Sequence, residues 1–171
     1  MARLDRTMVL NAAISLADDV GLEGTTVRRL AERLGVTPMA LYRHVADKGD
    51  LLDGMADRLY AELELPAAGG DWWEGLAGLA RSARRVLLAH PWAVPLFARP
   101  LAGGHARALD AALRAVLLDA GFTPAAAREL HGQLTGMVFS LVALEQHGRR
   151  NRAAFERGLE LLRAGLEARL R

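Results

Sequence analysis

Apolar residues recur every three to four positions along most of the chain, which is the spacing of one face of a helix. Near the beginning, this pattern predicts a helix over about 4–20 that Gly21 closes. Three shorter helices are predicted to follow, over 27–34, 38–44 and about 50–63. Gly35 stands where a left-handed residue can end the first of these three. The first third of the sequence is therefore expected to form a group of short helices.

Hydroxyl side chains and one proline mark the starts of the short helices. Thr25 and Thr26 can cap the helix over 27–34, and Thr37 can cap the next one, because a hydroxyl oxygen accepts a hydrogen bond from a free N–H of the first turn. Pro38 follows in that first turn, where its missing N–H costs nothing. The turn between these two helices is thus only a few residues long.

A second group of helices is predicted after a loop of Pro, Ala and Gly at residues 66–70. Prolines interrupt this group over residues 91–100, since proline lacks the N–H that a helix interior needs. The predicted helices have the ranges 72–90, 104–120, 124–147 and 151–170. The chain is thus expected to have a small N-terminal part and a larger helical body.

The amino-acid composition favours helices over strands. The 171 residues are 51% hydrophobic and 25% charged, which is ample for a core. Leu and Ala, both strong helix formers, dominate the apolar residues, whereas runs of β-branched residues are missing. We therefore predict an all-α fold. The sequence has no cysteine, which excludes disulfides, thiolate chemistry and cysteine-based zinc sites.

Hydropathy and charge limit where the protein can act. No apolar run approaches the ~20 residues needed to span a bilayer, and the charged start of the sequence does not resemble a signal peptide. We expect a cytoplasmic protein with no membrane partner. The formal charge is only +2, but residues 26–48 concentrate five Lys or Arg against two Asp or Glu. A short basic segment of this kind favours nucleic acid.

The basic segment has the pattern of a helix-turn-helix, in which the second helix enters the major groove of DNA. Apolar residues that pack the two helices together are predicted at Ala31, Val36, Leu41 and Val45. The other face of the second helix then presents Thr37, Pro38, Met39, Tyr42, Arg43 and His44. Met and Tyr beside Arg and His are unusual on a solvated face, but they suit DNA, where apolar atoms touch thymine methyls and Tyr bonds phosphate. A helical hairpin without this function can contain the same glycine turn, so the motif alone leaves both interpretations open.

Three features of the sequence resemble the TetR family of transcriptional regulators. They are the turn from Leu30-Ala31 to Leu34-Gly35-Val36, the segment Leu41-Tyr42-Arg43-His44, and Lys48 followed by Leu51-Leu52. The match is dense over about residues 8–63. The resemblance implies a three-helix DNA-binding domain over 1–49, followed by a helical ligand-binding and dimerisation domain over 50–171.

Position by position, the resemblance implies a set of DNA contacts. Thr26, Tyr42 and Lys48 match positions that hold phosphates, and the N-terminal dipole of its helix reinforces the contact of Lys48. The positions that face base edges or the backbone are Arg28, Thr37, Pro38, Met39, Arg43 and His44. The two arginines of this set are candidates for bidentate contact with guanine. Arg29 and Arg33 are expected to be solvated or to form intramolecular pairs.

Two apolar stripes near the end of the sequence predict an association surface, one on the helix over 124–147 and one on the helix over 151–170. The residues of the predicted dimer interface are Leu130, Leu134, Leu141, Phe155, Leu159, Leu162 and Leu166. Packing of the two helices within one subunit accounts for part of each stripe. In the TetR family the corresponding helices form a four-helix bundle across a two-fold axis. We therefore expect a homodimer, which brings two recognition helices to half-sites about one turn (~34 Å) apart.

A closer resemblance, to the tetracycline-repressor branch, covers parts of the body. It rests on residues 87–90, Ala98-Arg99-Pro100, Gly121-Phe122 and residues 136–145. Glu145 matches a carboxylate that helps to hold the magnesium–tetracycline chelate, whereas Pro95 stands near the position of the metal-binding histidine. We therefore expect an apolar or aromatic small molecule as the effector, and no metal. The residues assigned to its site are Trp92, Phe97, Arg99, Met137, Phe139 and Glu145, of which the aromatic residues and Met could instead belong to the core.

Other functions find less support in the sequence. No Ser/His/Asp order, Gly-rich phosphate loop or metal-spaced His cluster indicates an enzyme or a bound cofactor. A DNA-binding protein that answers to another protein, or to nothing, stays open as an alternative. The sequence thus predicts a ligand-responsive repressor that binds palindromic operator DNA as a homodimer and is released by its effector.

Overall fold

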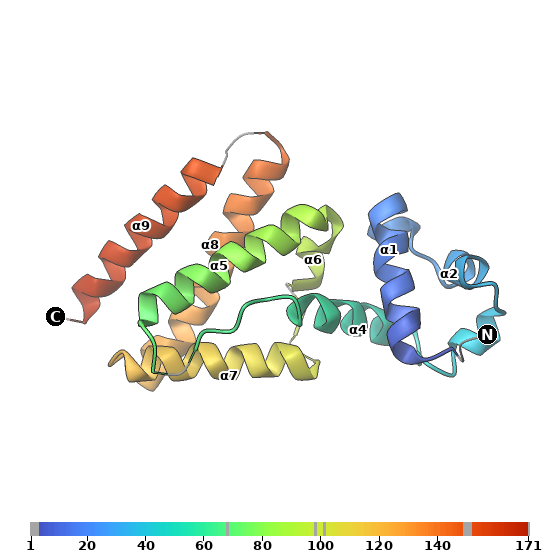
Figure 1. The fold of residues 1–171 in the computed structure, drawn as a ribbon, viewed down its shortest axis with the longest axis horizontal. Coiled ribbons are helices and arrows are strands. Elements are labelled where there is room, and N and C mark those ends of the chain that lie inside the picture. Colours follow the sequence, from blue (N-terminus) through green and yellow to red (C-terminus); the bar gives the residue numbers. More distant parts are fainter. Residues whose placement is uncertain (1–3, 68, 98, 101, 149–151, 171) are drawn as a thin grey trace. The chain divides into compact units, whose positions relative to one another are not determined.

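The computed structural model describes residues 4–67, 69–97, 99–100, 102–148 and 152–170, and within these ranges every regular element is a helix (Figure 1). The elements are α1 (Arg6–Gly24), α2 (Val27–Leu34), α3 (Pro38–Leu41), α4 (Lys48–Tyr60), α5 (Trp72–Ala89), the 3-10 helix η1 (Pro91–Ala93), α6 (Val94–Phe97), α7 (Gly104–Asp119), α8 (Pro124–Gln146) and α9 (Arg152–Arg169). None of these helices is both long and apolar enough to cross a membrane. The predicted all-α fold is confirmed.

The chain folds as two compact units. Unit 1 comprises Met1–Ala61 and His90–Ala106, and unit 2 comprises Glu62–Ala89 and Arg107–Arg171. Helix α7 therefore begins in unit 1 and continues in unit 2. The predicted boundary between residues 49 and 50 separates a DNA-binding part from a ligand-binding part, and it stays a prediction. In the packing of the structure, α4 belongs to the same unit as the helices before it.

Helix α1 is longer than the sequence predicts, because it continues past Gly21 across a kink. Gly21 has φ 75° and ψ 168°, a backbone conformation that glycine adopts without the steric cost of a Cβ. At the other end, the Asp5 carboxylate accepts a hydrogen bond from the N–H of Met8 at 2.8 Å and so caps the first turn. The glycine therefore bends the helix instead of ending it.

The third and fourth helices differ from their predicted ranges of 38–44 and 50–63. Helix α3 ends at Leu41, whose carbonyl accepts hydrogen bonds from the N–H groups of both His44 and Val45, at 2.8 and 3.0 Å, so the chain turns there. Helix α4 begins two residues early because Asp47 caps it, accepting from the N–H of Asp50 at 2.8 Å. The recognition helix is thus a single turn followed by a tight bend.

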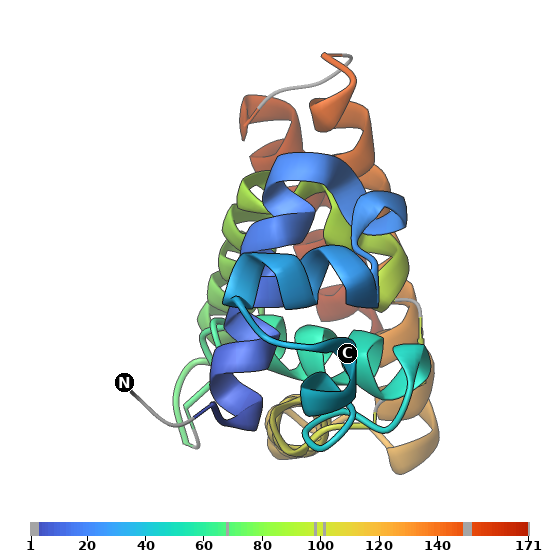
Figure 2. The same cartoon turned by 90° about the vertical axis from the view of Figure 1, so that its right-hand side faces the viewer.

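Unit 1 is built where α1 packs against α2 and α4, with α3 packed on α2 (Figure 2). Gly54 permits the close approach of α4 to α1, since a Cβ at this position would lie only 2.6 Å from Cδ2 of Leu10. The fully buried residues of this core include Val9, Ala13, Ala17, Leu30, Leu41, Leu51, Met55 and Leu59. Burial of these apolar side chains holds the four helices together.

The short elements η1 and α6 complete unit 1. Asp18 of α1 accepts a hydrogen bond from the indole Nε1 of Trp92 at 2.7 Å and pairs with Nδ1 of His90, also at 2.7 Å. Phe97 of α6 packs on Tyr60 of α4, with ring centroids 4.6 Å apart. A segment distant in the sequence therefore forms part of the packing of the N-terminal helices.

Unit 2 is held by α5 packed on α8 and by α9 packed on α8. Its buried residues include Trp73, Leu76, Leu87, Leu117, Leu130, Val142 and Phe155. Ser82 is fully buried and uses its hydroxyl twice, donating to the carbonyl of Leu79 at 2.9 Å and accepting from the N–H of Glu64 at 3.0 Å. Both polar capacities of this serine are therefore satisfied inside the core.

Candidate nucleic-acid interface

The turn between α2 and α3 has the geometry of a helix-turn-helix. Thr26 and Thr37 cap the two helices, each accepting a hydrogen bond at 3.3 Å from the N–H three residues on. Gly35 ends α2 with φ 65°, and the N–H of Val36 returns to the carbonyl of Ala31 at 3.0 Å. Of the two threonines predicted for α2, Thr26 is the cap, whereas Thr25 is buried and donates to the carbonyl of Gly21 at 2.9 Å. The predicted cap at Thr37 and the predicted glycine turn are confirmed.

Helix α3 and the bend after it expose a mixed apolar and basic surface. Met39 and Tyr42 have exposed fractions of 72% and 48%, whereas Leu41 between them is fully buried. The other exposed residues of this surface are Thr37, Pro38 and Arg43, while His44 is half-buried. An exposed methionine leaves apolar area in water that contact with a partner can bury. The predicted base-facing side chains of α3 are thus accessible.

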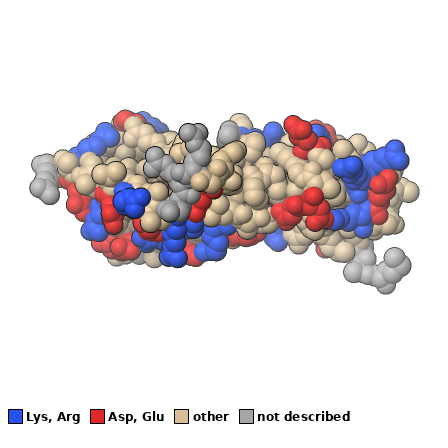
Figure 3. All heavy atoms as spheres, turned by 90° about the horizontal axis from the view of Figure 1, so that it is seen from above, with Lys and Arg blue, Asp and Glu red and all other residues tan. Residues whose placement is uncertain are grey.

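Two basic side chains beside this surface have no acidic partner in the described part of the chain. Among the residues that the structure describes, no Asp or Glu forms an ion pair with Arg43 or Lys48, and both are exposed. Lys48 is the first residue of α4, where the free N–H groups of the first turn favour an anion. Figure 3 shows one face of the molecule, on which Lys and Arg side chains lie at both ends among Asp and Glu side chains.

The other arginines of the helix-turn-helix have intramolecular partners. Arg28 pairs with Glu32 at 3.0 Å, and both side chains are exposed, by 87% and 61%. An exposed pair of this kind contributes ~0–1 kcal/mol, so Arg28 can exchange it for a contact with DNA at little cost. Arg33 pairs with Asp19, and Arg29 donates to a main-chain carbonyl at 3.3 Å. Both arginines thus form intramolecular contacts, which is one of the two outcomes expected for them.

An interaction that the sequence does not predict joins α1 to the segment between α3 and α4. The guanidinium of Arg6 donates to the carbonyl of His44 at 2.6 Å and to the two carboxylate oxygens of Asp50 at 2.9 and 2.6 Å. The N–H of Ala46 also donates to Asp50, at 2.8 Å. Hydrogen bonding to Arg6 lowers the pKa of Asp50, against the opposing effect of partial burial. The carboxylate therefore stays ionised at neutral pH.

Three of the residues assigned to the effector lie in unit 1, where each has a partner. Trp92 donates to Asp18 at 2.7 Å, and Phe97 packs on Tyr60. Arg99 forms an ion pair with Asp53 at 2.7 Å. Burial raises the pKa of Tyr60 to about 12, so its hydroxyl stays protonated. These side chains contribute to the packing of unit 1, and their contact with an effector stays a prediction.

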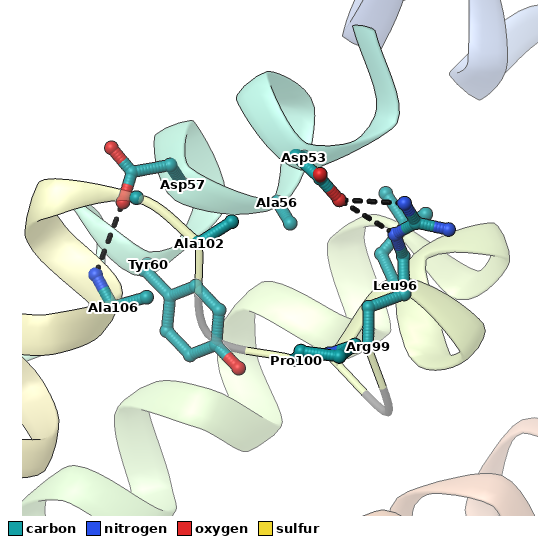
Figure 4. A pocket seen from close by; sticks show the side chains of 10 residues that line it. Asp53, Ala56, Asp57, Tyr60, Leu96, Arg99, Pro100, Ala102 and Ala106 are labelled. Atoms are coloured by element: carbon teal, nitrogen blue, oxygen red, sulfur yellow. Dashed lines mark hydrogen bonds and ion pairs between the residues drawn. The ribbon is translucent and has the colours of Figure 1, made fainter. Parts of the chain in front are cut away.

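A small pocket lies in unit 1 between α4 and the segment that leads into α7 (Figure 4). It is lined by Asp53, Ala56, Asp57, Tyr60, Leu96, Arg99, Pro100, Ala102, Gly103 and Ala106. In Figure 4, Asp53 and Asp57 project from α4 one turn apart, the first toward Arg99 and the second toward Ala106. Two carboxylates of one helix thus hold both ends of the same segment.

Asp57 acts as a cap for α7 although it belongs to α4. Its Oδ1 accepts hydrogen bonds from the N–H groups of His105 and Ala106 at 2.9 and 3.1 Å, and its Oδ2 lies 2.9 Å from Nδ1 of His105. Burial alone raises the pKa of Asp57, but these hydrogen bonds outweigh it and the pKa is lowered. Gly103 leaves room for the carboxylate, because a Cβ there would collide with it.

The remaining effector residues, Met137, Phe139 and Glu145, lie on α8 in unit 2 and are half-buried. Glu145 forms an ion pair with Arg84, with two contacts at 2.5 and 2.8 Å. The described residues contain no group of three or more His, Asp or Glu placed to hold a metal ion. The sequence predicts that the six residues line one effector site, and this stays a prediction.

Most residues of the predicted dimer interface are buried within one subunit. Leu130, Leu134, Phe155, Leu159 and Leu166 have exposed fractions of 9% or less, and Leu141 and Leu162 are half-buried. A Cβ at Gly158 would lie 2.9 Å from Leu141, which shows how closely α9 approaches α8. The exposed residues of the two helices outside the stripes, called here their outer face, include Leu161 of α9, exposed by 77%, and the small residues Gly132, Gly136 and Ser140 of α8. Most of the two apolar stripes is therefore covered within one subunit, where α8 packs on both α5 and α9.

Two known families match the sequence over both parts of the chain. Residues 9–55 match the bacterial regulatory proteins of the tetR family, and residues 65–153 match the tetracyclin repressor-like C-terminal domain. The first range contains the helix-turn-helix, and the second contains α5 to α8. Both matches agree with the resemblances found in the sequence.

Curated relatives are regulators of the same kind. The class A tetracycline repressor from transposon 1721 of Escherichia coli is 37% identical over 175 residues, which cover 100% of this chain and 80% of that protein. An HTH-type transcriptional regulator of Saccharopolyspora erythraea is 39% identical over 121 residues, which cover 70% of this chain and 51% of that protein. The match thus spans about half the length of this second relative.

Solved structures with bound DNA or ligand share the fold. A tetracycline repressor variant from Acinetobacter baumannii AYE in complex with minocycline has a TM-score of 0.86 and 31% identity, and the match covers 99% of each chain. BioQ with its double-stranded DNA operator has a TM-score of 0.77 and 30% identity, covering 97% of this chain and 99% of that one. The family consists of transcriptional regulators and not of enzymes. Family models match both parts of the sequence, one relative aligns along the whole chain, and solved members share the fold. This protein therefore belongs to the TetR family.

Proposed function

We propose that the chain is a ligand-responsive transcriptional repressor that binds palindromic operator DNA as a homodimer and is released by a small apolar or aromatic effector. The observation that carries the proposal is the exposed face of the helix-turn-helix. Met39 and Tyr42 are exposed there beside Arg43 and Lys48, for which the described part of the chain supplies no acidic partner. Unpaired cations attract phosphate, and apolar side chains beside them contact bases. Since its target is bacterial DNA, we expect the protein in the cytoplasm.

The proposed DNA contacts divide into phosphate anchors and base readers. Thr26, Tyr42 and Lys48 are the phosphate anchors; the Thr26 oxygen already accepts the bond that caps α2, which leaves its O–H free to donate to a phosphate. The proposed base readers and their neighbours are Arg28, Thr37, Pro38, Met39, Arg43 and His44. Arg28 joins this set by leaving its exposed pair with Glu32.

The proposed homodimer uses the outer face of α8 and α9. Among the described residues, Leu161 is the most exposed large apolar side chain. On α8, Gly132, Gly136 and Ser140 are spaced four residues apart and form an exposed row of small residues. Small residues allow a second helix to approach closely, and burial of Leu161 favours association. The buried leucines named in the sequence prediction support these helices from within.

The proposed effector is an apolar or aromatic molecule instead of a magnesium chelate. Glu145, which matches a chelate-binding carboxylate of the tetracycline branch, is held by Arg84, and both side chains are mostly buried, with exposed fractions of 15% and 19%. Half-buried Met137 and Phe139 on the same helix offer apolar surface. A ligand that binds such surface gains mainly from the burial of apolar area.

The experiment that tests the DNA-binding part is selection from a random pool of duplexes by the purified chain. We expect enrichment of a palindrome whose half-sites lie about one helical turn (~34 Å) apart. Recovery of duplexes without a shared sequence would contradict the proposal. A parallel selection on the support without protein measures non-specific retention of the duplexes.

The effector part is tested on the complex with the selected duplex. Magnesium–minocycline and a set of planar aromatic compounds without metal-binding groups are added separately, and release of the duplex is measured by fluorescence anisotropy. We expect release by at least one aromatic compound and none by the chelate. Release by the chelate alone would contradict the proposed effector class while leaving DNA binding intact.

A further inference from the structure

We propose that Arg6 is a positioning residue for operator recognition: by holding the His44 carbonyl and the Asp50 carboxylate together, it fixes how Arg43 and Lys48 meet one half-site. The inference rests on the proposed function, since it concerns the same DNA-binding surface. It assigns a role to a side chain of α1 that lies outside the helix-turn-helix itself.

The hydrogen bonds close a ring around the bend between α3 and α4. Arg6 bonds the His44 carbonyl at one end of the bend and both oxygens of Asp50 at the other. Asp50 in turn accepts the N–H of Ala46, which lies between them, at 2.8 Å. The residues that the ring encloses therefore cannot change their path unless several charge-assisted hydrogen bonds break together.

The ring adjoins one cation of the DNA-binding surface and encloses the other, and neither has an acidic partner among the described residues. Arg43 directly precedes His44, and Lys48 lies two residues before Asp50. Helix α3 is only one turn long, so its own main-chain bonds hold it weakly against the rest of the unit. A fixed bend therefore sets the distance and direction from Arg43, a proposed base reader, to Lys48, a proposed phosphate anchor.

The same geometry argues against Arg6 as a phosphate anchor. Its guanidinium already makes three hydrogen bonds, and Asp50 compensates its charge at 2.6 Å. Affinity for non-specific DNA comes from cations that neutralise phosphates and thereby release counterions. An arginine whose charge a carboxylate already neutralises adds little to this affinity. The two roles therefore predict different effects of substitution.

A second link between α1 and α4 provides a matched control. Arg58 of α4 donates to the Asn11 side chain of α1 at 3.2 Å, away from the bend. Arg58→Lys and Arg6→Lys make the same chemical change at a link between the same two helices. Of these two links, only that of Arg6 contacts the DNA-binding segment, through the carbonyl of His44.

The test compares these variants on the duplex selected by the unaltered chain and on a random duplex of equal length. A lysine at position 6 keeps the charge but cannot make the forked contact with Asp50 and also reach the His44 carbonyl. We expect Arg6→Lys to lose about tenfold in discrimination between the two duplexes, the loss typical of one charge-assisted hydrogen bond. Its affinity for the random duplex and its salt dependence should stay unchanged, and Arg58→Lys should match the unaltered chain throughout.

Asp50→Asn gives a second, opposite signature. Loss of the carboxylate frees the charge of Arg6, so affinity for the random duplex should rise while discrimination falls. Equal gains on both duplexes, with discrimination kept, would show that Asp50 acts only through its charge and would overturn the proposal. Thermal unfolding and titration of the active fraction confirm that each variant compared is folded.

The remaining outcomes separate the inference from the function on which it rests. Arg6→Gln removes the charge that lysine keeps. A salt slope that falls in Arg6→Gln by about 0.9 for each phosphate no longer neutralised would make Arg6 a phosphate anchor and overturn its positioning role. Unchanged discrimination in Arg6→Lys would overturn it as well. Failure of the unaltered chain to select any duplex would instead overturn the proposed function.

Discussion

Arg43 and Lys48 carry the same charge but have different chemistry and different positions. Arg43 follows α3 on the exposed face, and its planar guanidinium can make two parallel hydrogen bonds to guanine. Lys48 is a point charge in the first turn of α4, where the helix dipole also favours a phosphate. The two side chains are therefore expected to contribute to different parts of DNA binding.

Alanine at each position should separate these contributions. Arg43→Ala should lose about 1–3 kcal/mol of discrimination between the selected and the random duplex. Lys48→Ala should weaken binding to both duplexes equally and reduce the salt slope by about 0.9 for each phosphate that is no longer neutralised. Anisotropy titrations at several salt concentrations measure both quantities. The same effect of both variants on both duplexes would show that the two roles are assigned wrongly.

Arg84 and Glu145 form the most deeply placed ion pair that the described residues show in unit 2, and the Arg84 guanidinium also lies 5.7 Å from the centre of the Phe155 ring. Removal of the carboxylate leaves a cation in a largely buried place without its partner. We expect Glu145→Gln to lower the free energy of unfolding by about 2 kcal/mol, measured by urea denaturation. Glu167→Gln, at the exposed pair with Arg163, should change it by less than about 0.5 kcal/mol. Equal effects of the two substitutions would contradict the importance of burial at this pair.

Residue types with local signals could be predicted from the sequence, whereas partners distant along the chain could not. The caps at Thr26 and Thr37 follow from a hydroxyl placed before an apolar period, and both are present. Arg6 and Asp50 are 44 residues apart, and no periodicity connects them. The resemblance to the TetR family suggested contacts with DNA, but it gave no information about which cations are already paired.

At the scale of elements, α4 connects more of unit 1 than its sequence suggests. It packs on α1 and on α6, and two of its carboxylates, Asp53 and Asp57, bond residues that precede or begin α7. The apolar period of α4 predicted a helix, but it contained no sign that one of its acidic residues caps another helix. The predicted lengths of α1 and α3 were also wrong. In α1, Gly21 bends the helix and does not end it. After α3, the carbonyl of Leu41 accepts two hydrogen bonds that turn the chain.

Asp57→Asn tests the charge of this cap. The pKa of Asp57 is lowered in the folded state, so its charge adds stability that is present above the unfolded pKa, ~3.9, and is lost as the pH falls through the lower folded value. We expect Asp57→Asn to cost about 1 kcal/mol at pH 7, because the amide oxygen can still cap α7 but without charge. The difference from the unaltered chain should shrink below about pH 4, as the Asp57 carboxyl becomes protonated.

Urea denaturation from about pH 7 to below about pH 4 measures the difference. Glu62→Gln is the matched control, since Glu62 is an exposed carboxylate just after α4. A difference for Asp57→Asn that does not change with pH would mean that its charge contributes nothing to the cap.

For the whole molecule, the position of the proposed dimer interface is the least predictable feature. An apolar stripe on a helix shows that one face is covered, but it does not show whether the cover is a neighbouring helix or a second subunit. In α8 and α9 most of the stripe is covered within the subunit, as the exposed fractions of Leu130 and Phe155 show, both 1%. A second copy can therefore contact only the exposed side of α8 and α9, which lies outside the apolar stripes.

Leu161→Glu should convert the proposed dimer into a monomer, because a carboxylate in a close helix interface loses its hydration without a partner. Light scattering at several protein concentrations measures the mass. Leu118→Glu, on the exposed side of α7, should leave the dimer intact, since Leu118 is also partly exposed but lies on another helix. A Leu161→Glu protein that keeps the mass of the dimer would contradict the proposed face.

Unit 1 is formed by two separate segments of the chain, which determines where chimaeric regulators with exchanged DNA-binding domains can be joined. A graft that ends after Ala61 carries Asp18 and Tyr60 away from the indole and the phenyl ring that cover them, because Trp92 and Phe97 lie in the later segment of the unit. A graft that also transfers His90–Ala106 keeps these contacts. The shorter graft should therefore melt at a lower temperature than the longer one, even where both bind the same DNA.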